Sequence, residues 1–462
     1  MKDLRIHFVR LWWELAVSVL ALVAWPPGAM AAPATYVLRT ARTAGAIDHV
    51  AIQLDVGGDV KEIVEGKVKS MKMSVGCTMA YDEKTLDMPA ATALGKQSSD
   101  SASGTGSRWR GIRQYGEVSA VVKVENEQFK PAIRPDRRLI ALTVELPVVT
   151  LFSPRGTLTR DELELIDILG NSLLLDALLP ERPVAVGDQW KHSGKLMAGL
   201  LGLDAVSQTD AQSTLVAVND TTARMELSGR VEGTLGGVSS EIELKAKYRY
   251  NLSSKRIDWV GLLVKEERAI GHVKRGVSAV ARLQLTIEPN AVVPALADAA
   301  LHDLPVEPTA ALLQMAYSSA VGGWEFTHDR RWYITGEQRE TAIFRMLDQG
   351  ELIAQCNVSS LPKSPAGKEV TLAEFQEDVK RALGDNFRQF VEAGQSENPA
   401  GCRVYRVIVR GEVSQVAIQW NYYLLSDAQG HRVVFAFTME SKLADRLDQT
   451  DTKLVRSFRF GK

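Results

Sequence analysis

Apolar and charged side chains alternate without a break between residues 241 and 250. The apolar set is Ile242, Leu244, Ala246, Tyr248 and Tyr250, and the charged set is Glu243, Lys245, Lys247 and Arg249. Because successive side chains of a β-strand point to opposite faces of the sheet, the pattern predicts a strand with one buried and one solvated face. A turn over 251–255 leads to a partner strand over 256–267, so we expect a meander of long antiparallel strands.

The chain has 462 residues, which is more than one ordinary hydrophobic core accommodates. Four prolines punctuate residues 288–321, namely Pro289, Pro294, Pro305 and Pro308. Proline stiffens the chain and suppresses sheet pairing, so this stretch is predicted to be a linker between a first domain, 32–287, and a second domain, 322–462. The predicted fold class is α+β. The first domain is expected to be a curved antiparallel sheet with inserted helices, and the second an antiparallel sheet flanked by helices.

A helical insert is predicted over residues 159–206 of the first domain. Thr159 and Glu162 have the spacing of a capping box, in which hydroxyl and carboxylate bind the free backbone N–H groups of a helix start. Residues 173–179 and 195–206 predict two further helices. Residues 89–107 are small and polar without periodicity, which predicts a flexible loop inside the domain.

The last of these helices has more apolar residues than a helix on a sheet surface needs, because such a helix buries only one stripe. The residues are Leu196, Met197, Leu200, Leu201 and Leu203. The surplus apolar surface must be buried deeply, pack against another helix, or line a cavity for an apolar ligand. These alternatives are open at this point, and the last makes the five residues candidate ligand contacts.

The N-terminus has the pattern of a secretory signal peptide. Lys2, Arg5 and Arg10 precede an apolar stretch over 15–25, and Ala29 and Ala31 supply the small residues that a signal peptidase reads. Residues 1–31 are therefore predicted to be removed after export to the periplasm or the exterior. The alternative is an uncleaved anchor, although the apolar stretch is shorter than the about 20 residues that span a bilayer. No transmembrane segment is expected after cleavage.

Three cysteines are present, Cys77, Cys356 and Cys402. An exported location permits disulfides, and Cys356 and Cys402 lie in the same predicted domain, so they are a candidate pair. The alternative is that all three are small buried hydrophobic residues, because spacing alone does not determine pairing.

Known reaction motifs are absent from the sequence. It contains no H-E-x-x-H, G-x-S-x-G, Walker A or G-x-G-x-x-G pattern, and no two of its seven histidines have metal-ligand spacing. No catalytic residue, cofactor or metal is predicted. Lys plus Arg number 55 and Asp plus Glu 56, so the whole chain has no charge excess that favours nucleic acid or an anionic membrane surface, although a local patch is possible.

Two clusters of polar residues are candidate sites although known motifs are absent. The first is acidic and lies at the start of the predicted insert: Asp161, Glu162, Glu164 and Asp167. It would hold a cation or act as acid and base, or it would compensate the helix dipole on a solvated face. The second is the segment 328–332, His-Asp-Arg-Arg-Trp, which would bind an anion or form an exposed turn beside a packed tryptophan.

The second domain resembles the fold family of the photosystem II extrinsic protein PsbP, which also includes a Ran-binding nuclear-import factor. The resemblance rests on Trp324 and Phe326, a capped helix from Thr371, the aromatic strand 420–423 and a closing helix before Phe458. It implies partner binding rather than catalysis. The strand meander of the first domain is similar to the half-barrel of the lipoprotein carrier LolA and related lipid-binding envelope proteins.

The whole mature chain also resembles large exported bacterial proteins of unknown function. The matching stretches are 153–165, 178–190 and 353–357. The leading hypothesis is a non-enzymatic exported envelope protein that carries an apolar ligand or binds an envelope protein partner. The competing hypotheses are a hydrolase-type enzyme with a site assembled from dispersed residues, and a purely structural scaffold.

Overall fold

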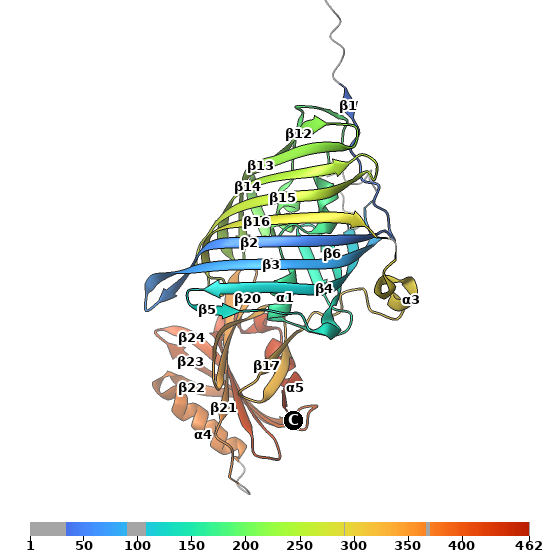
Figure 1. Ribbon diagram of the computed structural model, residues 1–462. Helices are drawn as coiled ribbons and strands as arrows, with labels where there is room; N and C mark the ends of the chain where they lie inside the picture. The colour runs from blue at the N-terminus through green and yellow to red at the C-terminus, as the bar shows by residue number, and fades with distance from the viewer. Residues whose placement is uncertain (1–33, 90–107, 291, 366–369, 462) are drawn as a thin grey trace, which may run out of the picture. The chain divides into compact units, whose positions relative to one another are not determined.

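The computed structural model describes residues 34–89, 108–290, 292–365 and 370–461 (Figure 1). The predicted signal peptide and nearly all of the predicted loop 89–107 lie outside these residues. Strands hold 56% of the described residues and helices 15%. The predicted α+β class is therefore wrong: the protein is mainly antiparallel β. Helices hold too small a share of the described residues for a balanced α+β fold.

The largest sheet has 13 strands and is called the large sheet below. Its order is β10-β12-β13-β14-β15-β16-β2-β3-β4-β6-β7, with β11 paired to β13 and β5 to β4. The strands are β2 (Ile47–Val64), β3 (Lys67–Asp87), β4 (Arg108–Val124), β5 (Glu127–Phe129), β6 (Leu139–Glu145), β7 (Val148–Phe152), β10 (Gln189–Lys191), β11 (Ala205–Thr209), β12 (Gln212–Val218), β13 (Thr222–Leu235), β14 (Val238–Asn251), β15 (Arg256–Arg268) and β16 (Gly276–Pro289). A separate pair joins β1 (Thr35–Tyr36) to β9 (Val184–Ala185).

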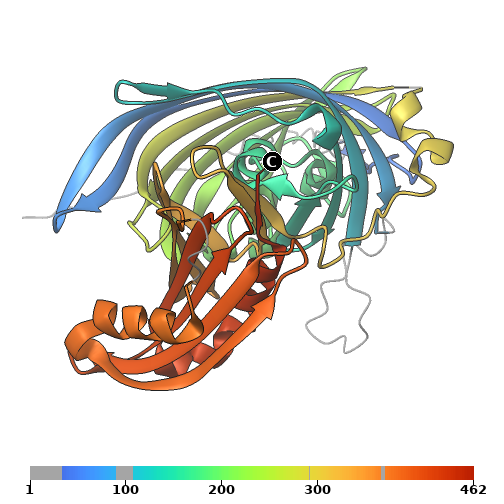
Figure 2. The same ribbon diagram turned by 90° about the horizontal axis from the view of Figure 1, so that it is seen from below.

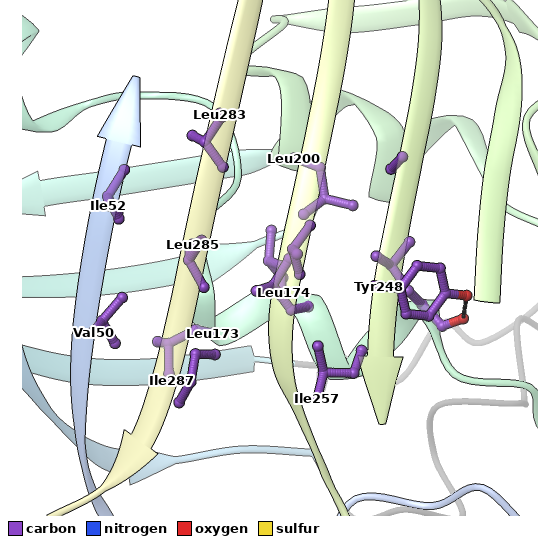
Figure 3. Close-up of a cluster of buried hydrophobic side chains, with 14 of the residues drawn as sticks. Val50, Ile52, Leu173, Leu174, Leu200, Tyr248, Ile257, Leu283, Leu285 and Ile287 are labelled. Atoms are coloured by element: carbon purple, nitrogen blue, oxygen red, sulfur yellow. Dashed lines mark hydrogen bonds between the residues drawn. The ribbon is translucent and has the colours of Figure 1, made fainter. Parts of the chain in front are cut away.

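The alternating segment 241–250 is the middle of β14, and its predicted strand is confirmed. Buried and exposed residues alternate along the strand, and the apolar set from Ile242 to Tyr250 lies on the buried face. The predicted turn after it joins β14 to β15. Figure 3 shows part of the resulting core, where Leu283 and Leu285 of β16 lie near Leu174 and Leu200 of the insert.

A glycine pair is typical of turns, but Gly57 and Gly58 lie inside β2. The reason is the neighbouring strand: a Cβ on Gly58 would lie 2.2 Å from the Ser278 carbonyl oxygen of β16. Glycine at this position permits the close approach of two backbones. The actual turn is at Glu65 and Gly66.

Replacing Gly58 by alanine is expected to lower the free energy of unfolding by about 1–3 kcal/mol, because the added methyl group overpacks the contact between β2 and β16. Gly57 is the matched control, since a Cβ there would meet nothing within 4 Å. Gly57→Ala should stay within about 0.5 kcal/mol of wild type. Urea unfolding followed by circular dichroism measures both, and equal losses would contradict the close-approach explanation.

The predicted insert packs on the concave face of the large sheet (Figure 2). It contains α1 (Arg160–Ile166), the 3₁₀ helix η2 (Ser172–Leu178) and α2 (Gly194–Leu201). The predicted capping box at Thr159 and Glu162 is confirmed. The third helix is shorter than predicted, because Gly202 ends it in a left-handed conformation and β11 begins at Ala205. The remaining 3₁₀ helices and α3 are η1 (Pro135–Arg137), η3 (Pro294–Leu296), η4 (Gly384–Asn386), η5 (Ser441–Leu447) and α3 (Asp298–Leu301).

The C-terminal part contains a sheet of seven strands in the order β19-β20-β21-β25-β24-β23-β22. Its strands are β19 (Trp332–Gln338), β20 (Thr341–Asp348), β21 (Glu351–Leu361), β22 (Phe387–Glu397), β23 (Arg403–Val413), β24 (Val416–Ser426) and β25 (Arg432–Glu440). The amphipathic helix α4 (Leu372–Leu383), with its confirmed capping box at Thr371, covers one face through Phe375, Val379 and Leu383. The predicted closing helix is η5 followed by α5 (Thr450–Ser457), which packs on the other face.

A smaller sheet of four strands joins segments from both predicted domains. Its strands are β8 (Leu158–Thr159), β17 (Met315–Ser319), β18 (Trp324–His328) and β26 (Arg459–Phe460), and β8 pairs with β17 in parallel. The strand β17 lies inside the stretch 288–321 that is predicted to be a linker. The Arg160 guanidinium also donates to the Arg330 and Trp332 carbonyl oxygens at 2.6 and 3.1 Å. The division into two domains stays a prediction. The four-stranded sheet and the hydrogen bonds of Arg160 connect the two predicted domains.

Candidate functional site

The insert begins at a buried carboxylate that orients α1. Glu162 accepts hydrogen bonds from the Thr159 backbone at 2.9 Å and from the Arg134 side chain at 2.7 Å. Burial opposes ionisation, but these donors outweigh it and hold the pKa of Glu162 below its ordinary value. Of the acidic cluster noted in the sequence, Glu162 is thus a cap and an ion-pair partner, not a free ligand.

A cavity of about 250 Å³ lies at the C-terminal end of α1 and is called the Asp167 cavity below. Its walls come from α1, α2, β7, the turn between β13 and β14, Lys274 and Tyr333 of β19. Apolar wall residues include Leu163, Ile166, Leu203 and Leu235. Six charged residues also line it, Arg113, Arg160, Lys274, Glu164, Asp167 and Asp204, so three cations face three carboxylates.

Two of these carboxylates have partners inside the protein. The Lys274 ammonium lies 3.4 Å from Glu164, and Asp204 accepts the Gly236 backbone N–H at 2.6 Å. Arg113, at the wall near η2, donates to Glu83 at 2.7 Å and to Asn171 at 2.6 Å. These contacts hold the polar wall in a defined arrangement before any ligand enters.

The carboxylate of Asp167 differs, because no described residue makes a hydrogen bond or ion pair with it. Its side chain is exposed to solvent at the open side of the cavity, although many protein atoms lie around it. Burial raises the pKa of Asp167 above its ordinary value, against the opposing effect of Arg330, Lys274 and Arg113. Asp167 also caps the C-terminus of α1, where the helix dipole disfavours a negative charge. An unpaired carboxylate is therefore held at an electrostatically unfavourable position facing an open volume.

Tyr333 forms an aromatic wall between two cations. The Arg160 guanidinium lies 4.5 Å and the Lys274 ammonium 5.4 Å from its ring centroid, distances typical of cation–π contacts. The Nε atom of Arg160 is buried without a hydrogen-bond partner among the described residues. Because this atom is buried, the unused donor lies within the packing around Arg160 and is not open to the cavity.

The polar segment 328–332 is a turn rather than an anion site. Arg330 donates to the Leu313 and Leu151 carbonyl oxygens at 2.9 and 2.7 Å, and burial and the nearby Arg160 lower its pKa to about 10. Trp332 is fully buried. His328 is also buried, and desolvation lowers its pKa to about 4.

The five predicted ligand contacts, four on α2 and Leu203 just after it, lie mainly in the core. Four of the five side chains are at most 7% exposed and Leu201 is half-buried. Figure 3 shows Leu200 beside residues of β16 and η2. Leu203 is the member of the set that also lines the Asp167 cavity. Deep burial and helix packing, two of the three alternatives, thus account for most of the apolar surplus.

A buried ionic network lies behind the cavity and was not predicted. Three arginines and three carboxylates from distant segments alternate in it: Arg42, Arg113, Arg256, Asp48, Glu83 and Asp176. Asp48 forms ion pairs with Arg42 and Arg256, and Glu83 with Arg42 and Arg113. Burial alone would lower the pKa of Arg42, but the surrounding carboxylates raise it above its ordinary value. Arg113 belongs to both the network and the cavity wall.

The three cysteines are buried free thiols in the structure. Cys356 lies on β21 opposite Phe437 of β25, and Cys402 precedes β23, where its backbone N–H binds Asn398 at 3.0 Å. The candidate disulfide between Cys356 and Cys402 is therefore not formed here, and the alternative of small buried residues describes them. Burial raises the pKa of both thiols.

In the described ranges, no group of three or more His, Cys, Asp or Glu residues is arranged to hold a metal ion. Across the same ranges, no helix combines the length and hydropathy needed to cross a membrane.

Comparison with known proteins gives structural likenesses only. No family model and no curated protein matches the chain. The solved structure of the cyanobacterial PsbP protein CyanoP from Synechocystis sp. PCC 6803 is similar to 32% of this chain and 92% of its own, at 17% identity and a TM-score of 0.26. The Saccharomyces cerevisiae Ran-binding protein Mog1p is similar over 32% of this chain and 95% of its own, at 11% identity and a TM-score of 0.26.

A third likeness is to the COG4313 outer membrane channel from Pseudomonas putida F1. It covers 87% of this chain and 97% of the channel, at 7% identity and a TM-score of 0.16. These likenesses concern fold alone.

Proposed function

We propose that this protein is an exported, non-enzymatic binding protein of the cell envelope, and that the Asp167 cavity holds a small zwitterionic ligand with an apolar portion. The observation that carries the proposal is the unpartnered carboxylate of Asp167, which lies at an unfavourable helix terminus and faces an open volume. Proteins retain destabilising groups mainly at functional sites, because selection for stability alone would replace such groups.

The charges of the cavity wall support the zwitterionic class. Three cations and three carboxylates line the cavity, so a bare anion or a bare cation would meet as much repulsion as attraction. Asp167 offers an acceptor for the ammonium group of a ligand. Arg160 and Lys274, which line the cavity, offer positive charge for its acidic group. Burying each ligand charge against an opposite charge limits the desolvation cost.

The size and the apolar wall limit the ligand further. The volume of about 250 Å³ is below the about 300–1,000 Å³ that is usual for drug-sized ligands, so the ligand is small. Leu163, Ile166 and Leu203 provide apolar surface next to the charges. The proposed binding site is therefore at the end of α1. It is not on the apolar face of α2, because that face packs in the core.

The remaining parts of the proposal come from the sequence and from resemblance. Export rests on the signal-peptide pattern of residues 1–31. We further propose that the C-terminal part has a PsbP-like fold and binds a protein partner of the envelope, as the resemblance implies.

Titration calorimetry with three probes of one carbon skeleton tests the ligand class. L-leucine carries both charges, 3-methylbutylamine only the ammonium, and 4-methylpentanoate only the carboxylate. We expect saturable binding of leucine and at least about tenfold weaker binding of each singly charged probe, because one charge-assisted hydrogen bond contributes about 1.5–3 kcal/mol. Equal binding of a singly charged probe, or no binding of leucine, would overturn the zwitterionic class.

Asp167→Asn locates the site. It should weaken leucine binding about tenfold or more without lowering thermal stability, because the replaced carboxylate has no partner to lose. Asp161→Asn, on the first turn of α1 and outside the cavity wall, is the matched control and should bind leucine as wild type does. Equal effects of the two substitutions would place the ligand elsewhere.

A further inference from the structure

The hairpin of β2 and β3 extends beyond the rest of the large sheet. β16 pairs with β2 only as far as Lys61, and β4 pairs with β3 only from Met73 onward. Residues 62–71 therefore form a two-stranded ribbon, called the hairpin tip below, and no strand of the described residues pairs with it on either side. A lone ribbon of two strands has marginal stability in water, so contact with another surface would stabilise it.

The hairpin tip exposes apolar side chains on both of its faces. Ile63 and Val68 form a cross-strand pair and are 62% and 64% exposed. Val64 points to the opposite face, because side chains alternate along a strand, and is 43% exposed. A flat protein partner would cover one face only. The interface of a lipid bilayer surrounds an inserted segment, so it would contact the apolar groups on both faces of the tip.

The charges around the apolar residues favour an anionic surface. Residues 61–72 contain four lysines, Lys61, Lys67, Lys69 and Lys72, against Glu62 and Glu65. Lys61 and Lys72 lie near Glu267 and Asp59, whereas Lys67 and Lys69 have no ion pair with any described residue. Lysines with long apolar stems commonly flank inserted groups and keep their ammonium ends at the headgroups.

We propose that the hairpin tip inserts into the boundary between headgroups and acyl chains of an anionic lipid bilayer. Three residues on each arm, from Ile63 and Val68 to the turn, extend about 10 Å, which matches the about 5–10 Å depth of interfacial insertion. The open strand edges restrict the tip to this wet boundary, because unpaired backbone groups are costly deeper in the bilayer. The proposal is independent of the Asp167 cavity.

Sedimentation of the full-length mature protein with vesicles tests the proposal. We expect binding to vesicles of equal parts phosphatidylcholine and phosphatidylglycerol. The double variant Ile63→Asp/Val68→Asp should bind at least about tenfold more weakly, because it removes two apolar side chains from the contact. The matched control is Val413→Asp/Val416→Asp, which alters an exposed valine pair at another hairpin end. That variant should bind vesicles as wild type does.

The lysines provide a second, independent test. Lys67→Glu and Lys69→Glu should each weaken binding to the same vesicles by about fivefold or more, and vesicles of phosphatidylcholine alone should bind wild type more weakly. Circular dichroism checks that every variant is folded. Absence of wild-type binding, or equal binding of wild type and the Ile63→Asp/Val68→Asp variant, would overturn the proposal. Sedimentation velocity that shows a dimer which this variant dissociates would also overturn it, because a second copy would then cover the tip.

Discussion

Replacing Glu83 by glutamine is expected to lower the free energy of unfolding by about 3–5 kcal/mol, because it leaves buried arginine charges uncompensated. Glu83 is fully buried, and its carboxylate lies 2.7 Å from Arg113 and 3.5 Å from Arg42. It also accepts a hydrogen bond from Ser172 at 2.8 Å. Glutamine keeps the shape but removes the charge, so the loss measures the electrostatic contribution of the network.

Glu226→Gln is the matched control for this substitution. Glu226 forms a cross-strand ion pair with Lys247 at 3.4 Å, and both side chains are more than half exposed. Such surface pairs contribute about 0–1 kcal/mol. Urea unfolding followed by circular dichroism compares the two variants. A loss for Glu83→Gln that is no larger than for Glu226→Gln would mean that the buried network does not stabilise the protein.

Acidification is expected to destabilise the protein through His328. Desolvation lowers the pKa of His328 in the folded protein from 6.5 to about 4. Between these values the unfolded chain binds a proton that the folded protein does not, so the free energy of unfolding falls as pH falls. The contribution is fully present above pH 6.5 and is lost by pH 4, a change of about 3 kcal/mol. His192, buried and with its pKa also lowered to about 4 by desolvation, adds a second contribution in the same window.

The substitution His328→Gln isolates this effect. Urea unfolding at pH 7 and at pH 4 measures how much the free energy of unfolding falls on acidification. This fall should be about 3 kcal/mol smaller in the variant than in wild type. His302→Gln is the control, because the His302 side chain is 82% exposed, and it should show the same fall as wild type. If His328→Gln also leaves that fall unchanged, burial of a neutral His328 is not a source of the acid sensitivity.

Local patterns in the sequence predicted local structure well. The strand around residues 241–250 and both capping boxes are confirmed, because each depends on residues within a few positions. The fold class failed for the same reason: a local pattern such as that of residues 205–206, at the end of a predicted helix, fits a helix or a strand. The pairing of β11 with β13 then decides between them, and no local pattern contains that information.

The sequence contains a signal for the buried network. Asp48 has the same strand phase as Val50, Ile52 and Leu54, and Glu83 the same phase as Met79 and Tyr81. A charged residue in phase with buried neighbours is expected to find a buried opposite charge. The partner itself could not be predicted, because Arg256 is 208 residues from Asp48 in the chain.

The sequence indicates only part of the cavity wall. Asp167 belongs to the acidic cluster at the start of the insert, and the dipole explanation suits Asp161 and Glu162, which lie in the first turn of α1. It does not suit Asp167, because the helix ends at Ile166 and Asp167 follows at its C-terminus. The opposing wall, Tyr333 and Lys274, comes from segments more than 100 residues away in the sequence, so only the fold brings the site together.

Native mass spectrometry of the protein purified from its own cell envelope tests the binding proposal most directly. Wild-type protein should retain one small adduct that is released on denaturation and carries both an amino and an acidic group, and Asp167→Asn should lack it while Asp161→Asn keeps it. Wild-type protein without any adduct, or the same adduct retained by Asp167→Asn, would contradict the account.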